Sequence, residues 1–191
     1  MTLPECYGCK FDGAGHPCRR ADGSFDFAKV AMAIVRRGHA FRDDGTQEEV
    51  ILSETDWVSN CEYEVEHHHP DRLIPLVIAA MDACETPRDA GYVAAGLLEN
   101  AVCNHGPLLI GRIEEIASLS AKFRYFLSAI WGQNRADPAV WARVCKAVGS
   151  NGRMDTDGRC PWDGQPITAL DEQAATELMK ERVAVSARDA G

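Results

Sequence analysis

The sequence predicts an all-α protein, an array of about seven helices packed antiparallel to their neighbours. Three observations predict this class. Apolar residues recur at spacings of three and four along most of the chain, which is the period of one helix face. Asp, Ser, Pro and Gly stand where these helices would begin or end. The connections between them are short, and short connections favour antiparallel neighbours.

The stretch from residue 90 to residue 131 shows the helical pattern most clearly. Its first apolar face comprises Ala90, Val93, Ala94, Leu97, Leu98 and Ala101. We predict that Asn104-His105-Gly106 ends this helix and that Pro107 opens a second one, where its missing N–H is no loss. Ser120 is expected to be the N-cap of a third helix. The buried stripe of that third helix is expected to contain Phe123, Phe126, Leu127, Ile130 and Trp131.

The same reasoning predicts further helices on both sides of this stretch. They cover residues 27–38, 48–66, 70–84, 137–149 and 169–184. Trp57 and Trp141 lie on apolar stripes and are expected in the core, like Trp131. The predicted organisation is an irregular Cys- and Gly-rich segment (1–24), a helical domain (25–148), a loop containing Cys-Pro-Trp-Asp-Gly (149–168), and a C-terminal helix and tail (169–191).

About half of the chain also carries the motifs of a known family. These are Trp57, the Pro-opened helix from Pro70 to Met81, Ala95-Gly96-Leu97-Leu98-Glu99, His105-Gly106, and Phe123-Arg124…Leu127…Trp131. With them, the segment from about Trp57 to Val148 resembles an uncharacterised bacterial family of all-helical domains of unknown function. The family often has Pro where this chain has Leu97. The resemblance implies an all-helical bacterial domain and no particular activity.

Length, charge and cysteine usage limit the classes of function. A chain of 191 residues can bury a hydrophobic core that is stable without disulfides or bound metal. The net charge of −9 disfavours binding to nucleic acid, which needs basic patches, and mildly favours a basic partner. The N-terminus has no basic region followed by an apolar one, and no apolar run approaches membrane-spanning length. We therefore expect a cytoplasmic protein whose eight cysteines are reduced thiols or metal ligands.

The strongest chemical signal is a cluster of metal-ligand residues near the N-terminus. Cys6-x-x-Cys9 is followed by His16-x-Cys18, and thiolates two residues apart can share one zinc ion. Cys160, and less readily Asp163, is a further candidate from the second irregular segment. The fourth ligand is thus either His16 or Cys160. A closed structural zinc site is favoured over an open catalytic one, and the alternative is free loop cysteines or a redox pair at Cys6 and Cys9.

Other candidate residues have weaker support. His67-His68-His69 point in directions about 100° apart on a helix, which favours a polar turn over a metal site. Glu99 and His105 are six residues apart and point in different directions, so a packing or solvated role for Glu99 is favoured over catalysis. Trp162 lies beside Cys160 with no apolar stripe, and it either covers the metal site or is an exposed binding residue.

The sequence lacks the P-loop, HExxH, GxSxG and GxGxxG signatures. We therefore expect a non-catalytic protein-binding module, with an immunity protein, an antitoxin or an anti-defence inhibitor of a basic partner as its specific forms. The alternative is a small metal-dependent enzyme, or a metal-organised nucleic-acid factor, that acts through Cys6, Cys9 and Cys18. An open coordination position would favour the enzyme, and salt-dependent nucleic-acid binding would favour the factor.

Overall fold

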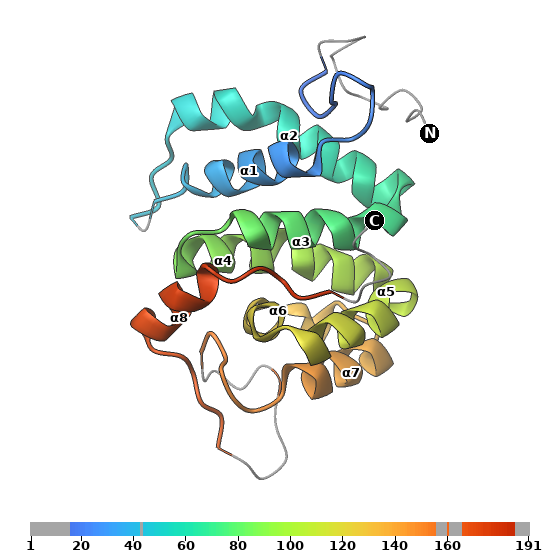
Figure 1. Ribbon diagram of the computed structural model, residues 1–191, viewed down its shortest axis with the longest axis vertical. Coiled ribbons are helices and arrows are strands. Elements are labelled where there is room, and N and C mark those ends of the chain that lie inside the picture. The colour runs from blue at the N-terminus through green and yellow to red at the C-terminus, as the bar shows by residue number, and fades with distance from the viewer. Residues whose placement is uncertain (1–15, 43, 156–159, 161–165, 186–191) are drawn as a thin grey trace. The chain divides into compact units, whose positions relative to one another are not determined.

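The computed structural model describes residues 16–42, 44–155, 160 and 166–185, and it confirms the all-α prediction (Figure 1). Besides helices, these residues form only isolated β-bridges. The chain divides into two compact units, residues 1–83 and 84–191. Each unit has its own buried apolar residues.

The first unit consists of α1 (Phe27–Gly38), α2 (Glu49–His68), a single 3-10 turn η1 (Pro70–Arg72) and α3 (Leu73–Ala83). Helix α1 packs against both α2 and α3. The predicted end of the first helix at Gly38 and the break before Pro70 are both confirmed. Its buried apolar side chains include Val30, Ile34, Val58, Val65, Leu76 and Val77.

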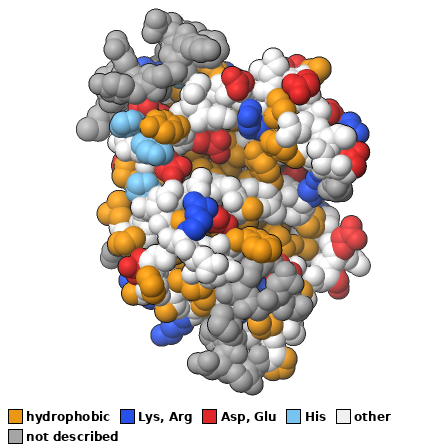
Figure 2. All heavy atoms as spheres, turned by 180° about the vertical axis from the view of Figure 1, so that it is seen from behind, with side chains coloured by type: hydrophobic (Ala, Val, Ile, Leu, Met, Phe, Trp, Pro, Cys, Tyr) orange, Lys and Arg blue, Asp and Glu red, His pale blue; other side chains and the backbone are white. Residues whose placement is uncertain are grey.

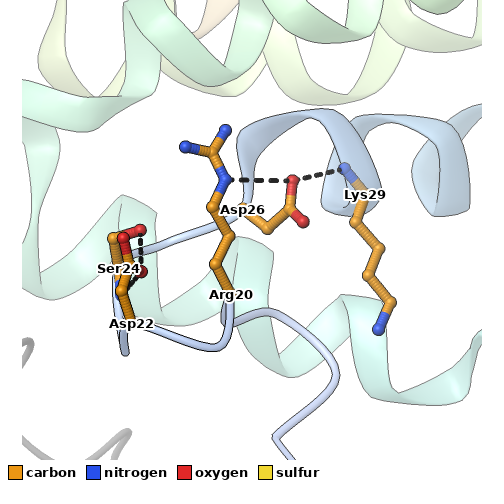
Figure 3. A network of polar contacts seen from close by, with 5 residues as sticks. All are labelled: Arg20, Asp22, Ser24, Asp26 and Lys29. Atoms are coloured by element: carbon orange, nitrogen blue, oxygen red, sulfur yellow. Dashed lines mark hydrogen bonds and ion pairs between the residues drawn. The ribbon is translucent and has the colours of Figure 1, made fainter.

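A tight turn leads the chain into α1 (Figure 3). The Asp22 carboxylate accepts hydrogen bonds from the backbone N–H of Ser24 at 2.9 Å and from its hydroxyl at 2.6 Å. These bonds hold the pKa of Asp22 below its ordinary value, and the bond from the Ser24 hydroxyl has the larger effect. Asp26 then caps the helix by accepting from the backbone N–H of Lys29, and Arg20 lies 3.9 Å from the same carboxylate. Sequence features local to 20–26 therefore fix where α1 begins.

A second turn of the same construction leads into α2. Asp44 accepts from the backbone N–H of Thr46 at 2.9 Å and from its hydroxyl at 2.6 Å. Gly45 has φ +81°, as does Gly23 in the first turn, a conformation that L side chains rarely adopt. The shared signal is Arg, any residue, Asp, Gly and then Ser or Thr, over residues 20–24 and 42–46. Short turns with one hydrogen-bond pattern thus precede both helices.

The second unit contains the remaining helices. They are α4 (Pro87–Val93), a π-helical turn η2 (Ala94–Leu98), α5 (Glu99–Leu119), α6 (Ala121–Leu127), a 3-10 turn η3 (Gly132–Asn134), α7 (Pro138–Val148) and α8 (Glu172–Met179). Helix α5 packs against α6 and α7, and α8 packs against α4 and α6. The predicted caps Ser120 and Asp137 are confirmed, since each accepts backbone N–H groups of its helix. Helix α8 is shorter than the predicted 169–184, because Asp171 is its N-cap.

The predicted helix end at Asn104-His105-Gly106 is wrong. Helix α5 continues through these residues and contains Pro107 in its interior. Gly106 is explained by packing: a Cβ atom added there would lie 2.6 Å from Cγ1 of Val140 on α7. The residue that resembles a helix terminator therefore lets two helices approach closely.

Two alanine substitutions on α5 are expected to have opposite effects. Gly106→Ala should lower the free energy of unfolding by about 1–3 kcal/mol, because its methyl group collides with Val140. Gly111→Ala should raise it by about 0.5–1 kcal/mol, because a Cβ there meets nothing within 4 Å and alanine favours the helix. Urea unfolding measures both. Combining Gly106→Ala with Val140→Ala should recover part of the loss, and a loss unchanged in the double variant would contradict the packing argument.

Candidate functional sites

Glu99 is a buried carboxylate that fastens the segment after α6. It is 6% exposed, and the π-helical turn η2 (Ala94–Leu98) immediately before it contains the first four residues of the Ala95-Gly96-Leu97-Leu98-Glu99 motif. One of its oxygens accepts the backbone N–H of Trp131 at 2.7 Å. The other accepts from the guanidinium of Arg135 at 2.7 Å, and Arg135 also reaches Asn100 at 3.3 Å. Of the two roles expected for Glu99, hydrogen-bonded packing is correct and a solvated position is not.

Trp131 lies at the surface, and its predicted place in the core is wrong. Its residue exposure is 57%, whereas Trp57 and Trp141 are partly buried. Helix α6 ends at Leu127, so the helical period no longer applies four residues later. The chain turns inward at Gly132, where an added Cβ would lie 3.0 Å from the ring of Trp141 and 3.1 Å from Sγ of Cys103. Trp131 is therefore an exposed aromatic residue whose backbone is held by Glu99.

His16 and Cys18, two of the predicted metal ligands, lie together in the first unit. Nδ1 of His16 is 2.8 Å from Sγ of Cys18, and both residues are buried. Burial, and to a smaller extent the charge of Arg19, lowers the pKa of His16 below its ordinary value. The backbone N–H of Asp26 donates to the Cys18 carbonyl at 2.9 Å, which ties this pair to the turn before α1. Cys6 and Cys9 lie outside the described residues.

Cys160 lies in the second unit, where its partner is Cys145 of α7. The pKa of Cys145 is lowered, chiefly by a hydrogen bond with the Cys160 side chain and further by the charge of Arg153, while burial opposes the shift. Arg153 also donates to the Cys160 carbonyl at 2.7 Å. Sequence reasoning did not select Cys145, because it lies on the apolar stripe of α7. Trp162 and Asp163 lie outside the described residues. Among the residues that are described, no three His, Cys, Asp or Glu side chains are grouped so as to hold a metal ion.

The predicted polar turn at His67, His68 and His69 is only partly correct, because His67 and His68 lie in the last turn of α2 and His69 is its C-cap. The ring of Tyr63 stacks on His67 with centroids 4.0 Å apart, and Nε2 of His69 is 4.0 Å from a carboxylate oxygen of buried Glu64. Histidine side chains gather at one side of the face drawn in Figure 2. On the same face, Lys and Arg side chains lie as separate spots among acidic and apolar ones.

Glu62 on α2 has a pKa raised to about 7, chiefly because burial disfavours its charged form. The positive charge of Arg37 opposes this shift, and the negative charge of Glu66 adds to it. The unfolded chain ionises this carboxyl at a lower pH than the folded protein does. Stability should therefore fall as pH rises from about 4.5 to about 7 and stay level above that.

The neutral variant Glu62→Gln tests this assignment. Its free energy of unfolding should be about 1–3 kcal/mol higher than that of wild type at pH 8, and the two values should be nearly equal at pH 4. Urea unfolding at both pH values measures the difference. Asp56→Asn, at an exposed position of the same helix, is the control and should change neither value appreciably. A gain of equal size at pH 4 and pH 8 would contradict the raised pKa.

A cleft of about 650 Å³ lies in the second unit, lined by parts of α6 and α8 and by Asn151, Gly152, Thr168 and Leu170. Two of its charged lining residues have partners: Arg124 donates to the carbonyl of Ala117 at 2.5 Å, and Glu177 pairs with Lys180 at 2.6 Å. The cleft is of a size that holds small ligands.

These features define an all-helical protein with an exposed tryptophan whose backbone N–H is held by a buried carboxylate. The chain belongs to a family of unknown function, DUF6869, whose model matches residues 45–152. This agrees with the resemblance inferred from about Trp57 to Val148. No curated protein and no solved structure matches the chain. None of the helices formed by the described residues is long and apolar enough to cross a membrane.

Proposed function

We propose that this chain is a non-catalytic protein-binding module whose contact surface is centred on Trp131. The observation that supports the proposal is an exposed tryptophan on an immobilised backbone. Tryptophan is among the residues most enriched at the energetic centres of protein interfaces. An anchor held in place before binding loses little conformational freedom when the partner arrives.

The anchoring of Trp131 supports this role more than exposure alone does. Leu108 is 67% exposed on the surface of α5, but leucine is under-represented at the energetic centres of interfaces. At Trp131 the buried carboxylate of Glu99 holds the backbone N–H, and the same carboxylate binds Arg135. A buried charged residue devoted to a surface loop is costly unless it is fully paired, and here both oxygens are paired.

The net charge of −9 favours a partner with a basic surface, through electrostatic steering. An immunity protein, an antitoxin or an anti-defence inhibitor would each fit this partner chemistry, and we propose that the module acts in the cytoplasm. The alternative, a metal-dependent enzyme or nucleic-acid factor using Cys6, Cys9 and Cys18, is distinguished by the metal experiment below.

Affinity purification with matched variants tests the proposal. The tagged full chain, Trp131→Ala and Leu108→Ala are used to capture proteins from cells that naturally produce this protein. Wild type and Leu108→Ala should retain the same protein in near-equal molar amount, and Trp131→Ala should retain at least about tenfold less of it. Retention should also fall as salt is raised. Equal retention by all three chains, with unchanged melting temperatures, would contradict the proposal.

We further propose that a structural zinc ion is held by Cys6, Cys9, His16 and Cys18. The convergence of His16 and Cys18 within 2.8 Å supports this set, and Cys6-x-x-Cys9 supplies the two remaining soft ligands from the sequence. Zinc here would organise the segment before α1 and contribute to folding.

Metal analysis of purified chains tests the ligand set. Wild type should contain about one zinc per chain, and the Cys160→Ser variant should contain the same. His16→Ala and Cys18→Ser should lose the ion and melt at a lower temperature. Zinc lost from Cys160→Ser but kept by His16→Ala would reverse the choice of fourth ligand. Zinc bound with an exchangeable water ligand, detected by X-ray absorption, would favour the enzyme instead.

A further inference from the structure

The cleft of the second unit is not used by the proposed function, and one of its walls is fixed by the backbone. This wall consists of two short segments joined by three hydrogen bonds. The N–H of Thr168 donates to the carbonyl of Ser150 at 2.9 Å, and the N–H of Arg153 donates to the carbonyl of Thr168 at 3.1 Å. The N–H of Leu170 donates to the Arg153 carbonyl at 2.9 Å, within a parallel bridge. The wall therefore keeps its shape without a ligand.

Helix α8 forms another part of the lining, and its C-terminal end is also fixed. The buried ammonium group of Lys122 donates to the carbonyls of Met179 at 2.8 Å and Glu181 at 2.9 Å. Glu181 itself lines the cleft. A site whose walls are in place before binding loses little conformational freedom when a ligand arrives.

Arg124 brings a guanidinium group with unused donors to the cleft. Its Nη1 donates to the carbonyl of Ala117 at 2.5 Å, which holds the group against the end of α5. A guanidinium has five N–H donors, so most of them remain available. In the part of the chain that the structure describes, no carboxylate forms an ion pair with Arg124. Such an arginine suits a carboxylate, which it can bind through two parallel hydrogen bonds.

Glu181 brings the opposite charge to the same cleft. Its backbone carbonyl is bound by Lys122, but no cation among the described side chains pairs with its carboxylate. Glu177 adds a second carboxylate, which Lys180 partly neutralises at 2.6 Å. These carboxylates would repel a simple anion, and Arg124 would repel a simple cation. The lining therefore favours a ligand that carries one charge of each sign.

The remaining lining offers apolar surface for the body of such a ligand. Leu178 is 8% exposed, Leu170 is partly buried, and Ala121 and Ala174 are further apolar lining residues. The volume of about 650 Å³ lies within the range of small-molecule sites. Covering this surface removes apolar area from water on both sides, which favours binding.

We propose that the cleft binds a small zwitterion with an apolar body, the chemistry of a short peptide of apolar residues or of a free apolar amino acid. The ligand carboxylate binds the guanidinium of Arg124, and the ligand ammonium binds the carboxylate of Glu181. The apolar body covers Leu170 and Leu178. All of these groups belong to the second unit, and the site is independent of zinc and of the role of Trp131.

NMR titration of the isotope-labelled full chain with leucyl-leucine tests the site. Saturable shifts are expected for amides of α8 and of Thr168 and Leu170. The affinity should be at least about tenfold lower for the N-acetylated dipeptide, which has no ammonium, and for the dipeptide amide, which has no carboxylate. Free leucine that binds as tightly as leucyl-leucine would identify an amino acid as the ligand, and weaker binding of leucine would identify a peptide.

Matched variants assign each charge of the ligand to its partner. Arg124→Gln should bind leucyl-leucine and its amide equally, and Glu181→Gln should bind leucyl-leucine and its acetylated form equally, because each preference needs both members of the pair. The control Glu172→Gln changes an exposed carboxylate in the first turn of α8, outside the lining of this cleft. It should keep both preferences.

Two results on the wild-type chain would overturn the proposal, and neither depends on whether a variant folds. One is the absence of any saturable shift at the cleft with leucyl-leucine and with leucine at millimolar concentration. The other is equal affinity for leucyl-leucine and its two blocked forms, which would mean that the cleft does not recognise charge. Wild-type preferences in Arg124→Gln and Glu181→Gln chains with unchanged melting temperatures would equally contradict the assigned partners.

Discussion

Glu99→Ala is expected to lower the free energy of unfolding by about 2–4 kcal/mol. The substitution removes a carboxylate that accepts two hydrogen bonds of 2.7 Å and leaves the backbone N–H of Trp131 without that acceptor. A buried donor without an acceptor costs about 1–3 kcal/mol, and hydrogen bonds to a charged group exceed neutral ones. The ion pair itself contributes less, because the Arg135 side chain is 51% exposed. Urea unfolding measures the loss.

Glu114→Ala on the same helix is the matched control. Glu114 also pairs with an arginine, Arg143, at 2.6 Å, but both side chains are substantially exposed. We expect a loss of less than about 1 kcal/mol there. If the two variants lost equal stability, the effect of Glu99 would be an ordinary ion-pair effect and the anchoring of Trp131 would have no support.

Lys122→Ala is expected to release α8 from the second unit. Lys122 is completely buried, and its ammonium group donates to the carbonyls of Met179 at 2.8 Å and Glu181 at 2.9 Å, at the C-terminal end of α8. Met179 is the last residue of α8 and Glu181 follows its C-cap, where intrahelical donors run out and a cation also matches the helix dipole. We expect a loss of about 2–4 kcal/mol.

Hydrogen exchange distinguishes local release of α8 from a general loss of stability. In Lys122→Ala, amides of α8 should exchange far faster while those of α5 keep most of their protection. Lys180→Ala, which removes an exposed partner of Glu177, should leave both helices as in wild type. Uniform loss of protection across the second unit would contradict the local role of Lys122.

The positions of most helices were predictable, because periodicity and caps are local signals. Asp137-Pro138 and Ser120 begin their helices as the sequence predicts. Pro107 was misinterpreted because a proline inside a helix and a proline at its first turn look alike in sequence. The two cases are distinguished here by the close approach of Gly106 to Val140, two residues that are 34 positions apart in the sequence.

The candidate sites were less predictable, because they depend on contacts between distant segments. Periodicity assigned Trp131 to a buried stripe, but α6 ends at Leu127 and the following turn exposes the ring. Cys145 belongs to an apolar stripe, so nothing local indicated its pairing with Cys160. The pairing of His16 with Cys18 was suggested by spacing alone, since ligands two residues apart lie on one turn.

The most direct test of the central claim is site-specific photocrosslinking beside Trp131. A photoreactive phenylalanine analogue replaces Gln133, an exposed residue two positions after Trp131, so that the tryptophan itself is kept. Met32, which is 64% exposed in the first unit, is replaced in a control. After irradiation in living cells, position 133 should yield one dominant crosslinked protein with a basic surface, and position 32 should not. Crosslinks at position 133 that match those at position 32, or none at either, would contradict a protein-binding surface at Trp131.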